Sequence, residues 1–295
     1  MRRKSLAIPI RVVNWSDTSQ VVGLFSREAG IVDAVAKGAH RFPNPFQGPF
    51  DLAVLWDVVF AERSSDRGLS ILTEGMVSDG FPGLRRHWAA WVAGAFVVEY
   101  LRAAGTAGEP SHDLFDAAVE ALKALSLEGI REAEGSTGVP GEGEDRLSLV
   151  VAAFEARAFR ILGLSAPQEA CVGCGRRWPG TDRPVFFSGR AGGILCSACR
   201  AKDPASSGVL VPGRAVHLQE TLASGSAGPD PLTEVPAAGA ETMAPAPASS
   251  GSSQGASSGR KAPALLAGLK SILGELRAFH LEHPFQMIKY AAKIF

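Results

Sequence analysis

The feature that most constrains the fold of this chain is the spacing of its cysteines. They form two C-x2-C pairs with 21 residues between the pairs, and they are Cys171, Cys174, Cys196 and Cys199. A C-x2-C step places two thiolates on one side of a tight turn, and two such turns brought together give the tetrahedral sulfur cage that zinc prefers. The segment Pro184–Leu195 has the pattern of strand, glycine-rich turn and strand, so we expect a hairpin that returns the second pair to the first. The sequence therefore predicts a zinc finger over residues 166–203 with one Zn2+ ion.

Four thiolate ligands leave no open coordination position, and the predicted zinc is therefore structural and not catalytic. Two alternatives are weaker. The first is that the four cysteines are free thiols, which would not explain why they occur in two C-x2-C pairs. A redox C-x2-C motif needs only one pair in a βαβ setting, and it would leave the second pair without a role.

Residues 5–77 have the pattern of a small β-domain. Short runs rich in Val, Ile and Phe alternate with turn residues. The expected strands are Leu6–Trp15, Gln20–Ser26, Ile31–Ala36, Asp51–Ala61 and Leu69–Met76. Five short strands in about 75 residues fit a closed barrel of the OB type, although an SH3-like barrel has a similar strand count. We expect this barrel to occupy residues 1–79.

After residue 79 the apolar residues recur at helical spacing. The expected helices are Leu84–Ala104, a second that begins near Pro110–Asp113, and a third over Arg146–Leu162. A weak strand at Gly208–Val211 and a short helix at Val216–Leu222 follow the cysteines. The fold class expected is thus α+β and multidomain, with a helical domain over 80–222 that carries the zinc finger as an insertion.

The segment 223–262 differs in composition from the rest of the chain. Ala, Ser, Gly and Pro dominate it, and it has too few large apolar residues to offset the entropy lost on ordering. We expect a disordered insert. An amphipathic helix resumes at Ala264 and is interrupted at Pro284, so residues 263–295 are expected to pack on the helical domain.

Charge and hydropathy narrow the class of protein only slightly. Lys plus Arg equals Asp plus Glu, at 30 each, so only local patches can indicate a charged partner. The longest apolar stretch, Trp88–Val98, is much shorter than the roughly 20 residues that span a bilayer. The basic N-terminus is followed by no signal-peptide cleavage pattern, and we expect a cytoplasmic protein with no membrane partner.

The sequence contains no catalytic constellation, and we expect no catalytic residues. His280-Leu281-Glu282 follows the cysteines, whereas the nucleobase-deaminase pattern needs its H-x-E ahead of them. Gly251–Gly255 matches G-x-S-x-G inside the low-complexity segment, where no strand or helix can build a nucleophile elbow. P-loop and dinucleotide motifs are missing from the sequence.

Local basic patches are the remaining signal. Residues 1–50 carry seven Lys/Arg against three Asp/Glu, residues 166–203 six against three, and residues 260–295 six against two. The candidate nucleic-acid contacts are Arg2, Arg3, Lys4, Arg11, Lys37, His40 and Arg41. We expect the first three to form a basic arm, which the others join if the first strand lies near the third. Such a stripe attracts phosphates with salt-dependent affinity, and the alternative is a basic arm without a function.

Several motifs occur in an order that resembles the bacterial RecO family. They are Asp17–Gly30, Ala36–Arg41, Gln47–Phe50, Phe154–Leu164 leading into Cys171–Gly175, and Gly192–Cys196. The resemblance implies an OB-fold barrel, a helical C-terminal domain and an inserted zinc finger. It also implies binding of single- and double-stranded DNA, annealing of complementary strands, and assistance to RecA loading. The partners implied are RecR and the C-terminal tail of the single-strand-binding protein, in the bacterial cytoplasm near the nucleoid.

Three function classes follow from these observations. The leading hypothesis is a non-enzymatic, DNA-binding recombination mediator in DNA repair. The second is a zinc-ribbon scaffold that binds only proteins and has no salt-dependent DNA affinity. The third is a metal-dependent or hydrolytic enzyme, which would need the open zinc position that four cysteine ligands do not leave.

Overall fold

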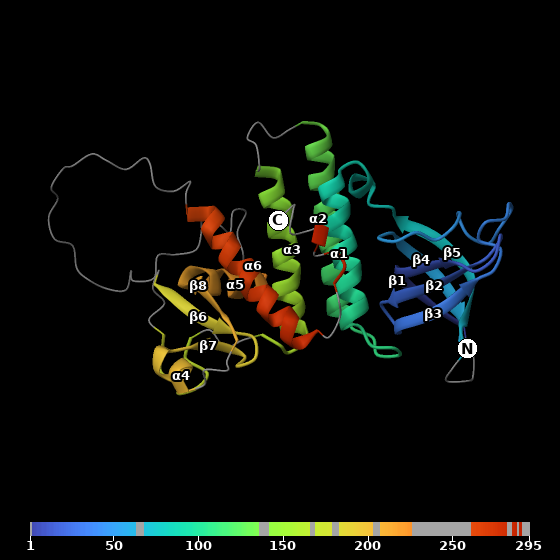
Figure 1. Ribbon diagram of the computed structural model, residues 1–295. Coiled ribbons are helices and arrows are strands. Elements are labelled where there is room, and N and C mark those ends of the chain that lie inside the picture. The colour runs from blue at the N-terminus through green and yellow to red at the C-terminus, as the bar shows by residue number, and fades with distance from the viewer. Residues whose placement is uncertain are drawn as a thin grey trace. The chain divides into compact units, whose positions relative to one another are not determined.

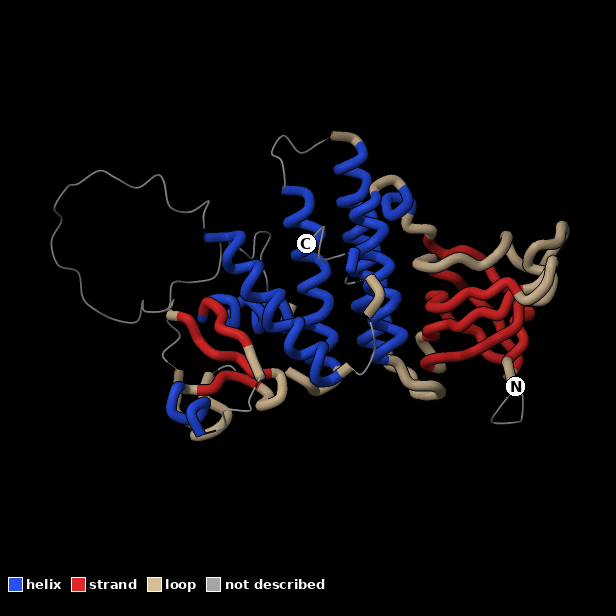
Figure 2. Tube along the Cα trace, viewed as in Figure 1, coloured by secondary structure: helices blue, strands red, loops and turns tan. Residues whose placement is uncertain are grey.

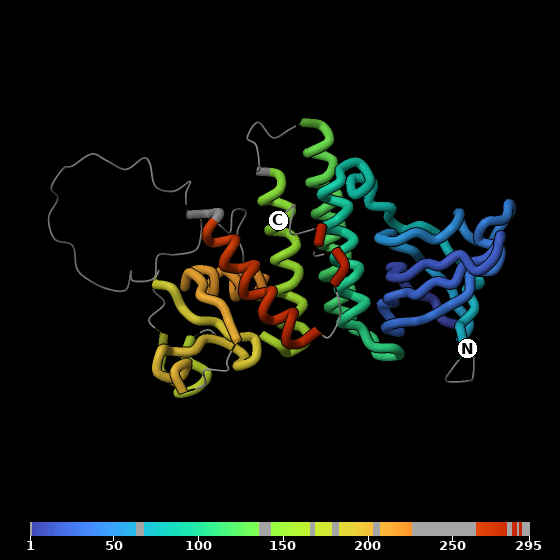
Figure 3. The backbone as a smooth tube through the Cα atoms, viewed as in Figure 1, coloured from blue at the N-terminus to red at the C-terminus, as the bar shows by residue number. Residues whose placement is uncertain are grey.

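A computed structural model of the chain describes residues 2–62, 68–135, 142–165, 169–178, 183–202, 207–225, 261–281, 285–287, 289 and 290. The chain divides into two compact units, Met1–Val151 with His283–Phe295, and Ala152–Glu282. Figure 3 follows the path of the chain by colour from the N-terminus to the C-terminus. The division falls within one helix, so the helical part of the chain is shared between the units, whereas the sequence suggested one helical domain over 80–222.

The first unit begins with a closed barrel, drawn in blue to cyan in Figure 1. Its strands are β1 (Arg2–Asn14), β2 (Gln20–Ser26), β3 (Gly30–Ala36), β4 (Leu55–Ala61) and β5 (Ser70–Asp79). The order around the barrel is β1-β2-β3-β5-β4, in which β3 and β5 are parallel and the other pairs are antiparallel. This Greek-key order is that of an OB-type barrel, and the predicted fold class is confirmed.

Strand β1 starts earlier than the sequence indicated. Arg2, Arg3 and Lys4 are not a free arm, because they pair in register with Ala61, Phe60 and Val59 of β4. The prediction placed the start at Leu6 because the apolar residues begin there, and these residues mark only the part of the strand that faces the core. The backbone hydrogen bonds to β4 begin earlier, at residues whose side chains are exposed.

Strand β4 starts later than predicted, at Leu55, because residues 37–54 form a long loop that closes one end of the barrel. Phe46 and Phe50 of this loop pack edge to face, with ring centroids 5.2 Å apart. The Phe50 ring lies 4.3 Å from the buried ring of Trp56. Gly75 of β5 permits this packing, since a Cβ there would lie 3.1 Å from the Phe46 ring and 3.2 Å from the Phe50 ring.

Helices follow the barrel within the first unit, drawn in blue in Figure 2 beside the red strands. They are the 3-10 helix η1 (Pro82–Arg85), α1 (Trp88–Ala104), α2 (His112–Ala133) and α3 (Glu142–Ile161), the last of which continues into the second unit. The sequence predicted one helix from Leu84. The backbone of His87 is extended, at φ −135° and ψ 127°, and it separates η1 from α1.

The turn between β2 and β3 joins the barrel to these helices. Gly30 has φ +65°, and a Cβ there would lie 2.3 Å from the Glu109 carbonyl oxygen, so only glycine fits. The Ile31 amide donates to the Thr106 carbonyl at 3.1 Å. Beside it the ring of Phe25 stacks on that of Phe115 with centroids 6.2 Å apart.

A C-terminal segment also packs on α1. The ring of Phe285 contacts the rings of Phe96 and Tyr100, at centroid distances of 5.6 and 6.1 Å. The Glu99 carboxylate accepts the backbone N–H groups of Gln286 and Met287, at 2.5 and 2.9 Å. These contacts explain why the tail belongs to the first unit although it follows the second along the chain.

The second unit combines the end of α3 with a small sheet and further helices. Its elements are β6 (Pro184–Ser188), β7 (Gly193–Leu195), α4 (Ser197–Lys202), β8 (Val209–Pro212), α5 (Gly213–Ser224) and α6 (Lys261–His280). The sheet order is β7-β6-β8, and α6 packs on α5, β8 and β6. The predicted hairpin between the cysteine pairs is therefore confirmed, with β8 added as a third strand. The greater part of the predicted insert, residues 226–260, lies outside the described residues.

Helix α6 is held on α3 by a buried ion pair. The Arg277 guanidinium donates to the Glu155 carboxylate, and the Glu155 side chain is almost completely buried. Gly189 lets the β6–β7 turn approach the same helix, because a Cβ there would lie 2.4 Å from the Glu275 carbonyl oxygen. Over the described ranges, no helix is both long enough and apolar enough to cross a membrane.

Candidate metal centre and nucleic-acid interface

The cysteines are held by a loop and by the elements that follow β7. Cys171 and Cys174 lie in a tight turn that Gly175 completes with φ +69°, its amide donating to the Cys171 carbonyl at 2.8 Å. Cys196 follows β7 directly and Cys199 lies on α4. The Val172 amide donates to the Ile194 carbonyl at 3.0 Å and so ties the first turn to β7.

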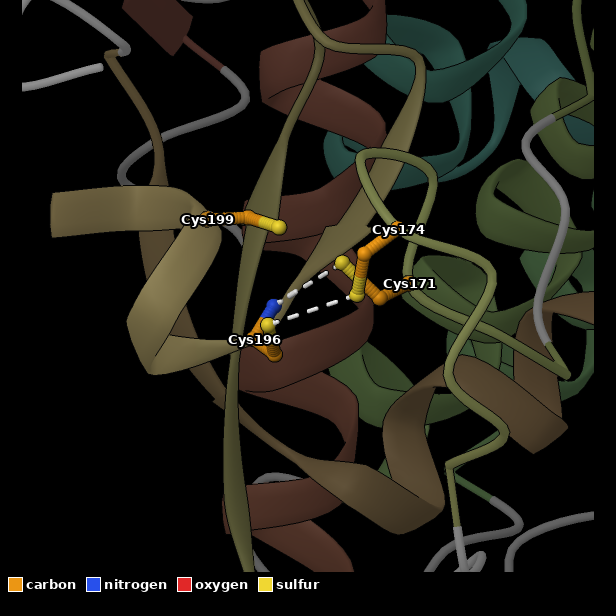
Figure 4. A group of neighbouring side chains, drawn as sticks. All are labelled: Cys171, Cys174, Cys196 and Cys199. Atoms are coloured by element: carbon orange, nitrogen blue, oxygen red, sulfur yellow. Dashed lines mark hydrogen bonds between the residues drawn. The ribbon is translucent and has the colours of Figure 1, made fainter. Parts of the chain in front are cut away.

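The four sulfur atoms converge on one point, as Figure 4 shows. All of them lie within 4.8 Å of one another, and the Sγ atoms of Cys174 and Cys196 are 3.8 Å apart. A tetrahedron with Zn–S bonds of about 2.3 Å has an S–S edge of about 3.8 Å. The four cysteines are unbridged. They therefore match the ligand set and size of a tetrahedral metal site, as the sequence predicted.

Backbone N–H groups favour the thiolate form at Cys171. Burial of this side chain opposes ionisation, but the amides of Cys196, Gly173 and Cys174 outweigh it and lower the pKa of Cys171 to about 6. The Cys196 amide lies 3.3 Å from the Cys171 sulfur. Hydrogen bonds that the Cys199 thiol donates to Cys196 and Cys174 keep the proton on Cys199 and raise its pKa to about 12. Such crowding of thiols is relieved when a cation displaces their protons.

A second candidate site is an open cleft of about 660 Å³ at the loop end of the barrel. It lies between the β1–β2 loop, the end of β3 and the long loop 37–54. The residues that line it are Trp15, Ser19, Val21, Val35, Lys37, Gly38, Arg41, Pro43, Asn44, Pro45 and Leu69. In OB-type barrels this region, formed by the second and third strands and their flanking loops, is where oligonucleotides bind.

Hydrogen bonds hold the two loops of the cleft together. The Gly38 amide donates to Ser19 Oγ at 3.2 Å, and the His40 amide donates to the Thr18 carbonyl at 3.2 Å. Buried Gln20 accepts the Phe50 amide at 2.8 Å and so fixes the far end of the long loop. These hydrogen bonds therefore fix the positions of the two loops that line the cleft.

One aromatic side chain that lines the cleft is exposed, as is a second one that follows a lining residue in the chain. Trp15, which lines it, is 74% exposed, and Phe42, which is next to Arg41, is 99% exposed. Exposed rings beside cations are typical of sites that stack nucleic-acid bases. Sequence reasoning missed both, because Trp15 reads as a strand end and Phe42 as part of a proline-rich loop.

Five of the seven predicted nucleic-acid contacts fall into two groups. Arg3, Lys4 and Arg11 each face a carboxylate, in the pairs Arg3–Glu62 at 3.0 Å, Lys4–Asp57 at 2.9 Å and Arg11–Asp33 at 3.0 Å. Lys37 and Arg41 line the cleft, and no described carboxylate pairs with either.

The other two predicted contacts lie outside both groups. Arg2 is exposed at the start of β1, and the His40 ring is hydrogen-bonded to Asn14 Oδ1 at 3.1 Å. Strands β1 and β3 both pair with β2 and not with each other. Arg11 of β1 nevertheless reaches Asp33 of β3 across β2, at 3.0 Å.

An OB-type barrel with an open basic and aromatic cleft, joined to a helical part with a four-thiolate site, defines a class of binding protein and not of enzyme. Family models support a closer assignment. The model described as "Recombination protein O N terminal" matches residues 1–81, and "Recombination protein O C terminal" matches residues 141–228. The chain belongs to the RecO family of DNA repair proteins. Because the family is one of non-enzymatic recombination mediators, the expectation that this chain is no enzyme is confirmed.

Individual relatives agree with this assignment. "DNA repair protein RecO" of Rhodopirellula baltica is 31% identical over 195 residues, which are 66% of this chain and 66% of the relative. The protein of the same name from Anaeromyxobacter dehalogenans is 29% identical over 203 residues, covering 69% of this chain and 72% of the relative. That from Rubrobacter xylanophilus is 26% identical over 220 residues, covering 75% and 80%.

Proposed function

We propose that this protein is a DNA-binding recombination mediator whose barrel cleft holds single-stranded DNA. The observation that carries the proposal is one cleft lined by Lys37 and Arg41, which pair with no described carboxylate, and by the exposed ring of Trp15. The exposed ring of Phe42 follows Arg41 directly in the chain. Duplex bases are stacked on their neighbours and cannot reach such rings, whereas the bases of a single strand can.

The two kinds of side chain make different contributions. Stacking on an aromatic ring contributes about 1–3 kcal/mol per base and tolerates any sequence. Contacts of cations with phosphates release counterions, so the logarithm of the affinity falls by about 0.7 per contact for each tenfold rise in salt on single strands. A mediator acts on DNA of any sequence, and both contributions meet that requirement.

Annealing and RecA loading need no active site. Two complementary strands that are held by their backbones, with bases free to pair, anneal faster than strands that meet in solution. We propose that the chain anneals strands in this way and assists RecA loading together with RecR and the tail of the single-strand-binding protein, in the cytoplasm. The family resemblance supports these partners.

For the four-cysteine site we propose Zn2+ as the resident ion. All-thiolate tetrahedral ligation suits zinc, and a closed site with no free position suits a structural role. Cys171, Cys174, Cys196 and Cys199 would hold it and so keep the β6–β7 hairpin joined to the preceding turn.

Among the seven predicted contacts we rank the unpaired cations of the cleft first. A cation that already faces a carboxylate must give up or share that partner before it can hold a phosphate. Lys37 and Arg41 are therefore expected to contribute more to affinity than Arg3, Lys4 and Arg11. Arg2 and His40 are expected to make minor contributions at the margin.

The test uses the full chain and a fluorescent oligonucleotide, with affinity measured by anisotropy from about 50 to 200 mM salt, the range in which phosphate contacts are evident. The double variant Lys37→Ala/Arg41→Ala should weaken binding and lower the salt slope by about 1.4, for two contacts. Trp15→Ala/Phe42→Ala should weaken binding to single strands by about 10-fold or more and leave the salt slope unchanged.

The matched control is Arg3→Ala/Lys4→Ala, which removes two cations from the same barrel but only ones that are ion-paired. Its effect should be smaller than that of the cleft variant. If the control weakens binding as much as the cleft variant does, the cleft is not the site. If the wild-type chain has no salt-dependent DNA affinity, the protein-only scaffold becomes the better hypothesis.

A further inference from the structure

The zinc finger carries a set of basic side chains that the barrel cleft does not use. The described part of the finger, residues 169–178 and 183–202, is called here the finger surface. Its cations are Arg176, Arg177, Arg183, Arg190, Arg200 and Lys202. All of them are exposed, and the one acidic side chain in these two ranges is Glu169.

The cations of the finger surface differ from Arg3, Lys4 and Arg11 of the barrel in having no acidic partner among the described residues. Among the described residues, no carboxylate forms an ion pair with any of them, whereas Arg3, Lys4 and Arg11 are all paired. Uncompensated charge concentrated on a small module repels itself and lowers stability. Its presence is therefore accounted for best by an anionic partner that binds there.

The metal centre compensates only part of this charge. Four thiolates around Zn2+ carry two negative charges, while the whole segment 166–203 has six cations against three carboxylates. The excess stays positive after the centre is counted. The Arg200 guanidinium lies 4.0 Å above the Phe186 ring and forms a cation–π contact with it.

The aromatic rings of the finger are not available for stacking on bases. Phe186 and Phe187 are buried in the sheet, and the ring of Trp178 stacks on His217 at 5.5 Å. This composition contrasts with the cleft, where exposed rings accompany the cations. The finger surface is suited to phosphates and not to unpaired bases, so its partner class is a nucleic-acid backbone of either strand state.

We propose that the finger surface is a second DNA-binding site, which holds the backbone of the second strand during annealing while the cleft holds the first. This inference rests on the proposed function, because annealing requires two strands and the cleft accounts for one. The two sites belong to different units of the chain. A strand held only by its phosphates leaves its bases exposed, which is the state that pairing with the first strand needs.

The experiment compares two full-length variants. Arg176→Glu/Arg177→Glu changes the finger surface, and Arg102→Glu/Lys123→Glu makes the same charge change at exposed cations of α1 and α2. Zinc content and thermal unfolding are measured for each, so that loss of the finger's fold is recognised. Should Arg176→Glu/Arg177→Glu lose zinc, Arg183→Glu/Arg190→Glu replaces it, since these positions are farther along the chain from the cysteines.

Two readouts separate the sites. Binding of one short oligonucleotide reports the cleft, and the annealing rate of two complementary fluorescent strands reports both sites. The finger variant should keep its single-oligonucleotide affinity within about twofold of the control while annealing slows several-fold. Loss of two phosphate contacts should also make the fall in rate between about 50 and 200 mM salt about sevenfold smaller than in the control.

A third measurement addresses the finger directly. The quadruple variant Lys37→Ala/Arg41→Ala/Trp15→Ala/Phe42→Ala removes the cleft contacts, and it should keep a weaker, salt-sensitive affinity for DNA. Adding Arg176→Glu/Arg177→Glu to this variant should abolish that remaining affinity. Three results would overturn the inference: annealing equal to the control, equal loss of binding and annealing, or a finger that binds an acidic peptide but not DNA. Wild-type protein that neither binds nor anneals DNA would instead refute the proposed function itself.

Discussion

Arg27, in the β2–β3 turn, forms two parallel hydrogen bonds with Asp116 of α2. Its Nε donates to Oδ1 and its Nη2 donates to Oδ2, both at 2.9 Å. The same guanidinium reaches Glu28 at 3.2 Å, and Glu28 in turn lies 3.4 Å from His112 Nε2 at the start of α2. This is one polar part of the contact between the barrel and the helices of the first unit, and the planar guanidinium is what allows two parallel bonds.

Arg27→Lys should therefore loosen this contact although it keeps the charge, because an ammonium cannot reproduce the paired geometry. The side chains of Arg27 and Asp116 are 32% and 45% exposed, so solvent screens the pair and we expect only a small loss in unfolding free energy. Hydrogen exchange at the Ile31 amide, which bonds to the Thr106 carbonyl, should accelerate. Arg11→Lys, at an exposed single-bonded pair with Asp33, is the control and should change neither measurement appreciably.

The packing of η1 on α2 depends on Gly83. A Cβ at this position would lie 1.7 Å from the Ser126 carbonyl oxygen, and that oxygen belongs to helix backbone that cannot move aside. Gly83→Ala should lower the free energy of unfolding by about 3 kcal/mol, as severe overpacking does. Gly80→Ala is the matched control, because a Cβ there has nothing within 4 Å. Urea unfolding of both variants tests this close approach, and equal stability would show that η1 does not lie against α2 in this way.

The buried pair of Glu155 and Arg277 should make stability depend on pH. Burial raises the pKa of Glu155, although the charge and hydrogen bond of Arg277 counteract this effect. A carboxyl whose pKa is higher in the folded state binds protons more tightly there, so stability falls as the pH rises from its ordinary pKa of 4.5 to the raised value. Glu155→Gln should remove this component from a series of urea titrations at different pH.

Removing only Arg277 should have a larger effect than removing both charges. Arg277→Met leaves a carboxylate buried without its partner, and we expect a loss of about 3–5 kcal/mol near neutral pH. Protonation relieves the burial, so the deficit should shrink as the pH is lowered. The double variant Glu155→Gln/Arg277→Met should recover part of the stability at neutral pH. A deficit that stays constant with pH would mean that Arg277 acts by packing alone.

Purified protein should contain one zinc ion per chain, bound by four sulfurs in X-ray absorption. Cys171→Ser should lower zinc content and make the finger susceptible to protease, because metal binding and folding are coupled in small modules of this kind. Val172→Ala, at a partly exposed neighbour in the same turn, should leave zinc content unchanged. A bound oxygen in the absorption spectrum, or a full complement of zinc in Cys171→Ser, would contradict closed four-cysteine ligation.

The cysteine spacing and the alternation of the barrel strands could be interpreted correctly from sequence because they are local. A C-x2-C turn brings its own thiolates together, and the hairpin between the pairs depends on residues next to one another in the chain. Glycine positions were informative for the same reason. Gly30 and Gly163 adopt the positive φ that a hairpin turn and a helix stop require.

The composition of the cleft, in contrast, was decided by tertiary structure. Trp15 and Arg41 are far apart in sequence, and only hydrogen bonds such as that from the Gly38 amide to Ser19 Oγ bring their loops to one opening. Whether a cation is free or paired is likewise a question of contacts across strands. Lys4 is neutralised by Asp57 only because β1 and β4 are neighbours in the barrel.

The sequence by itself thus indicated the cluster of four cysteines, the OB-type β pattern, the helical class of the rest and the family resemblance. Only the tertiary structure decided which cations remain available, where exposed rings accompany them, and that α3 is shared between two compact units. The physical reason is the range of the interactions. Turn geometry and side-chain periodicity act over a few residues, whereas ion pairing, burial and cleft formation depend on segments that meet only after the chain has folded.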